Sequence, residues 1–190
     1  MDKYYIHKDP ESPDELLTCF DEEGVIIEPH TRKEAHQEPL EYWHAVVNVW
    51  LIDKTGRMVC SLRSKTLSGK PNKWQTYFGG HVKAGNTFKE SAVMELAEEI
   101  GLKIDPNKLF LIKTGKWEPS KHFFESYTYP FNDSLEVLKF NDGEIVEATW
   151  FSFDEYNLDR QNNPDKWCNG CSPENQQLIK EWLNNQKYEN

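Results

Sequence analysis

The sequence predicts a single α/β domain in which strands dominate the middle of the chain and helices separate them. Apolar runs of strand length recur between turn signals, and two helical stripes of apolar residues lie in the centre and near the end. No linker-like segment divides the 190 residues, so one domain fits the length. Residues 1–13, which are polar and contain two prolines, are expected to be a flexible lead-in to a domain at 14–190.

The charge balance excludes one broad class of partner. The chain has 22 Lys and Arg against 32 Asp and Glu, which gives a formal net charge of −10. Such a protein repels a nucleic-acid backbone over most of its surface, so a duplex-binding module is disfavoured. An anionic small molecule would need a local source of positive charge, and a bound divalent cation is the natural one.

Membrane insertion and secretion are not expected either. No window approaches the roughly 18 consecutive apolar residues of a membrane span. The first residues lack the apolar stretch of a secretory signal. Four cysteines do not make a disulfide framework in a chain of this length, so we expect a cytoplasmic protein with free thiols.

The first elements are predicted from turn signals between apolar runs. Residues 16–27 predict a hairpin, because an acidic turn that ends in glycine separates two apolar runs. Residues 44–53 form a strongly apolar strand, and 57–62 are expected to return beside it after a turn at Gly56. Residues 63–75 form a basic loop in an otherwise acidic protein.

The second half continues in the same manner and ends in a helix. Further strands are expected near 108–114, 122–130 and 145–153. A C-terminal helix over 173–186 follows from the N-cap Ser172, a proline at the first helical position and one apolar stripe. The stripe consists of Leu178, Ile179, Trp182 and Leu183.

The most informative segment is a glycine-rich loop followed by a helix. Thr87 and Glu90 form a capping box, which predicts that the helix begins at residue 88. Gly101 stands where a left-handed backbone would end it. Apolar residues repeat at helical spacing and form the buried stripe, which comprises Val93, Leu96, Ala97 and Ile100.

Three acids of this helix, Glu95, Glu98 and Glu99, are expected to cluster on the face opposite the stripe, off the core. Carboxylates on one turn repel each other by about a few tenths of a kcal/mol per pair. A solvated acidic face is the common explanation of such a pattern, but the loop before the helix favours a ligand site. Its glycines let the backbone approach a ligand closely, and carboxylate oxygens on a rigid helix suit Mg²⁺ or Mn²⁺.

This segment resembles the Nudix box, the signature of the Nudix hydrolase superfamily. The signature reads Gly-x5-Glu-x7-Arg-Glu-U-x-Glu-Glu-x-Gly-U, where U is aliphatic, and the chain matches its register from Gly80 to Leu102 without a gap. Two positions depart, because Asn86 replaces the first glutamate and Met94 replaces the arginine. The resemblance implies a Nudix α/β/α sandwich with a mixed sheet and a core at about 42–158, to which the N-terminal hairpin and the C-terminal helix are additions.

The resemblance also implies an activity, the hydrolysis of a diphosphate linkage in a nucleotide-type or small organic substrate. It makes Glu95, Glu98 and Glu99 the catalytic metal ligands for Mg²⁺ or Mn²⁺. In the family the arginine is thought to brace an acid of the site, so its loss together with the loop glutamate would weaken or re-tune metal binding. The metal would neutralise diphosphate oxygens and activate water, and a carboxylate would take the proton. The sequence does not choose among the candidates for that role, which are Glu98, Glu99, Glu144 and Glu147.

Scattered positions over roughly 14–185 also resemble one branch of the superfamily, the type I isopentenyl-diphosphate isomerases and their hydrolase relatives. In the isomerases, histidines at positions resembling His36, His44 and His81 bind a metal together with downstream glutamates, of which Glu125 is the nearest match. The resemblance therefore implies a second metal site. Each histidine alone is more often a hydrogen-bonded structural residue.

Two rival functions remain open. The isomerases place a catalytic cysteine just before the Gly-His pair, and here that position is Gly79. Because the acids for hydrolysis are present and the isomerase nucleophile is missing, hydrolysis is favoured over isomerisation. A nucleotide-binding module without turnover is the second rival, which the departures at Asn86 and Met94 make credible.

Several other residues are candidates for substrate contact. The substrate-binding candidates are Gly79, Gly80, His81, Arg63 and Lys73, the last two because local positive charge suits phosphate. An exposed basic loop that only aids solubility is the alternative. The aromatic residues before the box are expected to pack in the core rather than to stack on a base, and they are Trp74, Tyr77 and Phe78.

The pair Cys168 and Cys171 is expected to form a turn before the last helix. The family resemblance also implies a homodimer as a candidate assembly.

Overall fold

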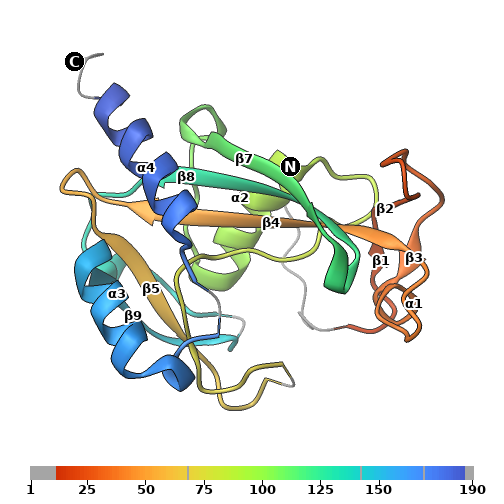
Figure 1. Cartoon of the computed structure of the whole chain (residues 1–190), viewed down its shortest axis with the longest axis horizontal. Coiled ribbons are helices and arrows are strands. Elements are labelled where there is room, and N and C mark those ends of the chain that lie inside the picture. Colours follow the sequence, from red (N-terminus) through yellow and green to blue (C-terminus); the bar gives the residue numbers. More distant parts are fainter. Residues whose placement is uncertain (1–11, 68, 142, 169, 187–190) are drawn as a thin grey trace.

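The structure, a computed structural model, describes residues 12–67, 69–141, 143–168 and 170–186 (Figure 1). Its strands are β1 Leu16–Leu17, β2 Cys19–Phe20, β3 His30–Thr31, β4 Trp43–Ile52, β5 Met58–Arg63, β6 Trp74–Gln75, β7 Phe110–Trp117, β8 His122–Pro130 and β9 Ile145–Phe151. Its α-helices are α1 Arg32–Ala35, α2 Phe88–Ile100, α3 Phe153–Asn162 and α4 Pro173–Gln186. Short 3₁₀ helices span Pro106–Lys108, Glu118–Ser120, Leu135–Val137 and Pro164–Lys166. The predicted lead-in at 1–13 lies outside the described residues except for its last two positions.

A mixed seven-stranded sheet forms the centre of the molecule. Five strands follow one another in the order β6-β5-β4-β8-β7, while β2 pairs with β4 and β9 pairs with β5. Strands β4 and β8 run parallel from the pair His44 and His122 to the pair Ile52 and Pro130, and β7 pairs antiparallel with β8. The mixed α/β fold and the C-terminal helix predicted from the sequence are confirmed.

The predicted hairpin of 44–53 with 57–62 is wrong in its pairing. Strands β4 and β5 pair only between Ile52 and Met58, after which β5 pairs with β6 and β9. The edge of β4 that β5 leaves is taken by the segment from Phe78 to Val82, and the Val47 N–H donates to the Gly80 carbonyl at 2.9 Å. Backbone hydrogen bonds therefore hold the first part of the glycine-rich loop against the central strand β4.

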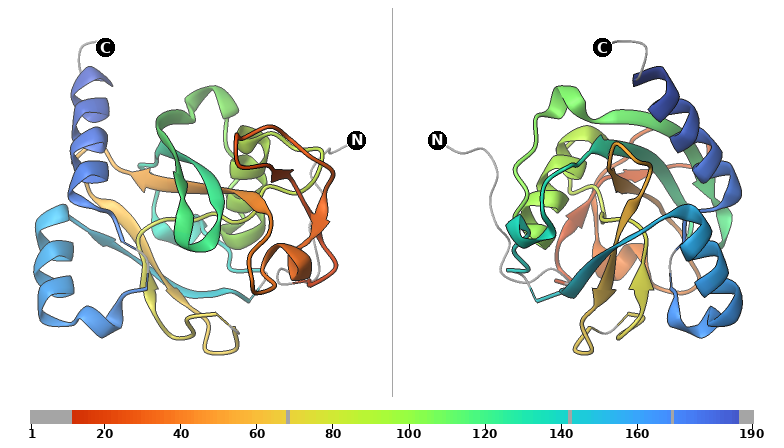
Figure 2. Two further views of the ribbon diagram at one scale, coloured as in Figure 1. Left: turned by 45° about the vertical axis from the view of Figure 1, so that its right-hand side comes forward. Right: turned by 90° about the vertical axis from the view of Figure 1, so that its left-hand side faces the viewer.

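Helices cover both faces of the sheet. In Figure 1, α4 crosses in front of β4 and β8 while α2 lies behind them, and Figure 2 shows α3 beside β5 and β9. Each face has its own apolar core. The core on the α2 side includes Trp43, Val47, Phe78, Leu96 and Ile100, and the core on the α4 side includes Trp50, Met58, Tyr156, Ile179 and Trp182. In the part of the chain that the structure describes, no helix is long and apolar enough to cross a membrane.

Residues 12–36 form a small unit at one end of the sheet, which we call the N-terminal module. It contains β1, β3 and α1 around its own apolar contacts among Leu17, Cys19 and Ala35. Backbone hydrogen bonds join it to the glycine-rich loop, since the Thr18 N–H donates to the Val82 carbonyl at 2.9 Å. The module is thereby held beside the segment that carries the signature.

Local capping signals account for the helix boundaries. Helix α2 begins after Thr87 with both hydrogen bonds of the capping box, and it ends at Gly101, whose φ is 65°. The predicted start and end of this helix are confirmed. Helix α3 was not predicted, although Ser152 and Glu155 form a capping box of the same kind. Its weakly apolar sequence gave no periodic stripe to accompany that signal.

Candidate active site

Helix α2 brings three carboxylates to one cavity. Glu95, Glu98 and Glu99 lie on its last two turns, and all three line a cavity of about 210 Å³. The three acids lie together as expected, but Glu99 is not on a solvated face, since its residue is only 4% exposed. The backbone N–H of Gly79 donates to its Oε2 at 3.3 Å, so the glycine-rich loop covers this acid.

Two glycines of the loop are required by close approaches. A Cβ on Gly80 would lie 2.7 Å from Oε1 of Glu95, so glycine lets that carboxylate pack directly on the backbone. Gly79 has a φ of +143°, and a Cβ there would lie 2.0 Å from the carbonyl oxygen of Val47. No side chain fits at position 79 in this backbone.

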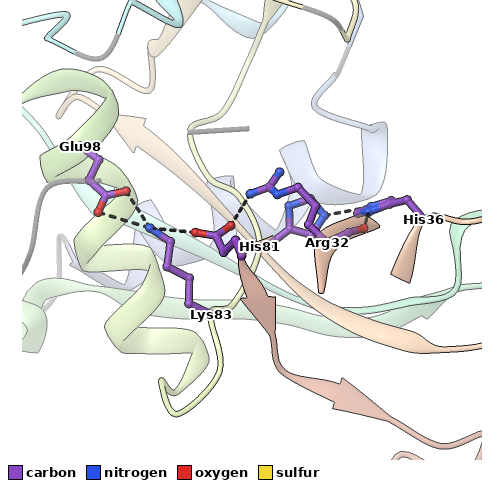
Figure 3. Close-up of polar contacts among 6 residues, drawn as sticks. Arg32, His36, His81, Lys83 and Glu98 are labelled. Carbon is purple, nitrogen blue, oxygen red and sulfur yellow. Dashed lines mark hydrogen bonds and ion pairs between the residues drawn. The ribbon is translucent and has the colours of Figure 1, made fainter. Parts of the chain in front are cut away.

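Cationic side chains line the same cavity from three separate segments, and they are Arg32, Arg63 and Lys83. Figure 3 shows Lys83 reaching toward Glu98 of α2, with Arg32 on its other side. The Lys83 ammonium lies 3.1 and 3.4 Å from the two oxygens of Glu98, and 3.5 Å from Oε1 of Glu15. Arg32 donates to the other oxygen of Glu15 at 2.6 Å. An alternating chain of charges therefore joins α2 to the N-terminal module.

The electrostatics of the cavity favour a further cation. Burial and the negative charge of Glu98 raise the pKa of Glu95 to about 8, although Lys83 acts in the opposite direction. The carboxylates are therefore under-compensated in the protein alone. An oxygen-only donor set with a surplus of negative charge is what Mg²⁺ and Mn²⁺ bind, so these residues fit a divalent ion.

The predicted phosphate-binding residues divide into two groups. Gly79, Gly80, His81 and Arg63 all line the cavity. Lys73 does not line it, and its ammonium donates instead to the carbonyl oxygen of Asp165. The structure therefore does not bring Lys73 together with the other four candidates.

Two acids outside α2 were candidates for taking a proton from water. Glu144 lines the cavity from the segment that leads into β9. Glu147 is exposed on β9 and is absent from the cavity lining. Position therefore leaves Glu144 as the loop acid that reaches the site.

Histidines from three segments meet beside the cavity. His36, His44 and His81 each present a nitrogen within 4.8 Å of the others, a separation that one metal ion can bridge. The Arg32 carbonyl can only accept, so Nδ1 of His36 donates to it at 2.8 Å and leaves the lone pair on Nε2. That Nε2 lies 3.1 Å from Nε2 of His81. A backbone hydrogen bond that fixes the tautomer in this way is typical of metal-binding histidines.

Burial keeps two imidazoles of this cluster, those of His44 and His81, neutral. Burial, followed by the neighbouring His36, lowers the pKa of His44 to about 3 and also lowers the pKa of His122. Burial lowers the pKa of His81 as well. Neutral imidazole is the form that binds metals. Nδ1 of His44 is buried without a hydrogen-bond partner among the described residues, so this nitrogen is free to contact a ligand.

Glu125 is not part of this cluster, which corrects the set of residues implied by the isomerase resemblance. Side chains alternate along β8, so His122 shares a face with its neighbour His44 while Glu125 points to the opposite face. There Glu125 accepts a hydrogen bond from Tyr127 and lines a separate, largely aromatic hollow. His122 is the residue of β8 that approaches the histidines.

The remaining candidates serve packing. Phe78 is fully buried in the core beneath α2, while Trp74 and Tyr77 pack against the core on the other face. Cys168 and Cys171 are free thiols on the segment before α4, and Cys171 is buried. Their thiols are not among the groups that line the cavity.

Sequence analysis missed three residues of the site, namely Glu15, Arg32 and Lys83. Glu15 and Arg32 come from the N-terminal module, and their pairing with the loop depends on tertiary contacts that carry no local pattern. Lys83 stands inside the signature, 15 residues before Glu98, and a cation in the stretch that leads to three acids was the available signal. Its proximity to Glu98 depends on how the loop folds back onto α2.

Comparisons with known proteins agree with this geometry. The model of the NUDIX domain family matches residues 42–168. An uncharacterized Nudix hydrolase of Clostridium acetobutylicum is 29% identical over 151 residues, which cover 75% of this chain and 72% of that protein. An uncharacterized Nudix hydrolase of Nostoc is 25% identical over 167 residues, which cover 87% and 92%. The crystal structure of DR0079 from Deinococcus radiodurans shares the fold, with a TM-score of 0.65 at 21% identity over 88% of this chain and 98% of that one.

The raised pKa of Glu95 predicts that divalent-ion binding depends on pH. Below about pH 8 a proton occupies the carboxylate and competes with the metal, so Mg²⁺ affinity should rise by up to about tenfold per pH unit as the pH increases toward 8. Calorimetric titration with Mg²⁺ at several pH values measures this affinity. Proton release on binding makes the observed binding enthalpy depend on the ionisation enthalpy of the buffer.

Two variants control that experiment. Glu95→Gln cannot bind the competing proton and should lose the steep pH dependence. Glu147→Gln, which removes an exposed acid outside the cavity, should keep it. An affinity of the unmodified protein that is constant between about pH 6 and 8 would contradict the proposed role of Glu95.

Proposed function

The chain belongs to the Nudix family, and from this premise we propose that it hydrolyses a diphosphate linkage in a nucleotide-type or small organic substrate with Mg²⁺ or Mn²⁺. The observation that carries the proposal is the convergence of opposite charges in one cavity. Carboxylates of α2 and Glu144 lie together with the cationic side chains of Arg32 and Arg63. Carboxylates suit the metal and guanidinium groups suit phosphate oxygens.

The reaction needs little covalent chemistry from the protein. A water oxygen attacks one phosphorus atom, the bond from that phosphorus to the bridging oxygen breaks, and the water proton leaves. A divalent ion bound at this site supplies charge neutralisation and a more acidic water. Glu95, Glu98 and Glu99 would hold the ion, and Glu144, which lines the same cavity from the segment before β9, would accept the proton.

The cationic residues support the substrate class. A protein with a net charge of −10 must invert its field locally to admit a diphosphate. Arg63 is oriented by hydrogen bonds to the Gly69 carbonyl at 3.1 Å and to the Gln75 side chain at 3.2 Å. A guanidinium held in this way loses less conformational freedom when it binds phosphate.

Isomerisation is the less favoured alternative on steric as well as chemical grounds. A thiol at position 79 would require a Cβ 2.0 Å from the Val47 carbonyl oxygen, so the isomerase cysteine has no room in this backbone. None of the four cysteines is among the residues that line the cavity in the described part of the chain. The proposal includes a cytoplasmic location, which free thiols favour, and assembly into a homodimer stays a prediction.

We further propose that His36, His44 and His81 bind a transition metal separate from the catalytic ion. Three imidazoles suit Zn²⁺, Co²⁺ or Ni²⁺ better than Mg²⁺, which prefers oxygen ligands. Such a metal would join the N-terminal module to β4 and to the loop at Gly80. Its role would be to fix the module in place.

The hydrolase proposal predicts that Glu98→Gln lowers turnover at least about tenfold, a loss of roughly 1.4 kcal/mol of transition-state stabilisation. Phosphorus NMR of the protein with Mg²⁺ and a panel of nucleotide and small organic diphosphates, isopentenyl diphosphate included, measures it. Hydrolysis by the unmodified protein should consume a diphosphate signal and release new phosphate signals.

Each outcome of that experiment has a distinct meaning. A shift of the double bond of isopentenyl diphosphate in a carbon NMR spectrum of the same sample, with no phosphate released, would identify an isomerase. Compounds of the panel that bind to the protein, as measured by calorimetry, but are never hydrolysed would identify a binding module. Equal turnover by Glu98→Gln would remove the acids of α2 from the mechanism.

The histidine proposal predicts that Co²⁺ binds with visible absorption that Zn²⁺ displaces. His81→Gln, which removes one of the three donors, should weaken Co²⁺ binding by at least about tenfold. Glu98→Gln should leave this absorption in place, because it changes only the carboxylate site. Loss of the Co²⁺ spectrum in Glu98→Gln but not in His81→Gln would contradict the assignment.

A further inference from the structure

The two departures from the signature contact each other. The side-chain amide of Asn86 lies 3.5 Å from the sulfur of Met94, so a neutral pair stands where the signature has a glutamate and an arginine. Met94 is one helical turn before Glu98. Helix α2 therefore carries no cation beside its three acids at that position.

Lys83, which lies in the loop before α2, brings a cation to Glu98 instead. Its ammonium lies 3.1 and 3.4 Å from the two oxygens of Glu98, and the two side chains are only 16% and 12% exposed. Water screens a pair at that depth less than one on the surface. A long, flexible glutamate side chain that contacts a fixed cation loses rotamers, which orients its carboxylate.

Glu15 holds that cation from the opposite side. Its side chain is 7% exposed and accepts from Arg32 at 2.6 Å, while its other oxygen lies 3.5 Å from the Lys83 ammonium. Glu15 stands outside residues 42–168, the part that matches the family model. The N-terminal module thus reaches the catalytic acids through a buried carboxylate and one lysine.

We propose that Lys83, held by Glu15, positions the carboxylate of Glu98 and replaces the cation that the helix lacks at Met94. This inference rests on the proposed hydrolysis. Lys83 acts through Glu98 and is a positioning residue, so its removal should lower the rate of the chemical step and leave substrate binding largely unchanged. The N-terminal module is then part of the catalytic machinery rather than an appendage.

The functional test compares four variants. Lys83→Met should lower kcat at least about tenfold while KM changes less than about threefold. Lys83→Arg, which keeps the charge, should retain most of the activity. Adding Met94→Arg to Lys83→Met returns a cation to the helix four residues before Glu98. The double variant should have a kcat at least about threefold higher than that of Lys83→Met alone. Lys89→Met, which removes an exposed lysine from the first turn of α2, is the matched control and should behave like the unmodified protein.

A second measurement does not depend on turnover. In metal-free protein, Lys83→Met should lower Tm by about 2–4 °C, because Glu98 loses its partner in a crowded acidic cavity. In a Glu98→Gln background the same substitution should have at most about half that effect. This double-mutant cycle measures the coupling of the two side chains even if no substrate has been identified.

Three results would overturn the inference. Additive effects of Lys83→Met and Glu98→Gln on Tm would show that the two side chains are not coupled. A raised KM with unchanged kcat in Lys83→Met would make Lys83 a substrate contact. Failure of Met94→Arg to restore any turnover in Lys83→Met would show that the helix position does not replace Lys83. Absence of turnover in the unmodified protein, with coupling intact, would instead count against the proposed hydrolysis alone.

Discussion

The concentration of carboxylates at the end of α2 is the constraint on which the rest of the structure depends. Glu95, Glu98 and Glu99 share a small cavity in which they are largely buried, so like charges repel more strongly than they do in water. The fold offsets this repulsion without removing it. Gly80 lets one carboxylate pack on the backbone, the Gly79 N–H donates to another, and a lysine pairs with the third. The remaining surplus of negative charge is what a divalent ion would neutralise.

Placing those groups requires parts of the chain that are distant in sequence. Strand β5 leaves β4 after one residue pair, which frees an edge of β4 for the glycine-rich loop. The N-terminal module then attaches to the other side of that loop through backbone hydrogen bonds, the ion pairs of Glu15 and the contact of His36 with His81. The site is therefore assembled between the matched family domain and a segment that precedes it.

The sequence predicted what depends on local chemistry. The limits of α2 follow from a capping box and a terminal glycine, and α4 follows from its N-cap, proline and apolar stripe, so both were found. What depends on tertiary pairing was missed or wrong. The partner of β5 is chosen by β6 and β9, Glu99 is buried by a loop that folds back over it, and Lys73 is drawn to the Asp165 carbonyl. Strand alternation, once β8 lies parallel to β4, turns Glu125 away from the histidines and places His122 beside His44 instead.

Anomalous diffraction from crystals soaked with Mn²⁺ tests the central claim most directly, because it locates the ion relative to named side chains. The account predicts a Mn²⁺ peak within coordination distance of carboxylate oxygens of Glu95, Glu98 and Glu99, and loss of that peak in Glu98→Gln crystals. A peak confined to His36, His44 and His81, with the cavity beside α2 empty, would contradict it.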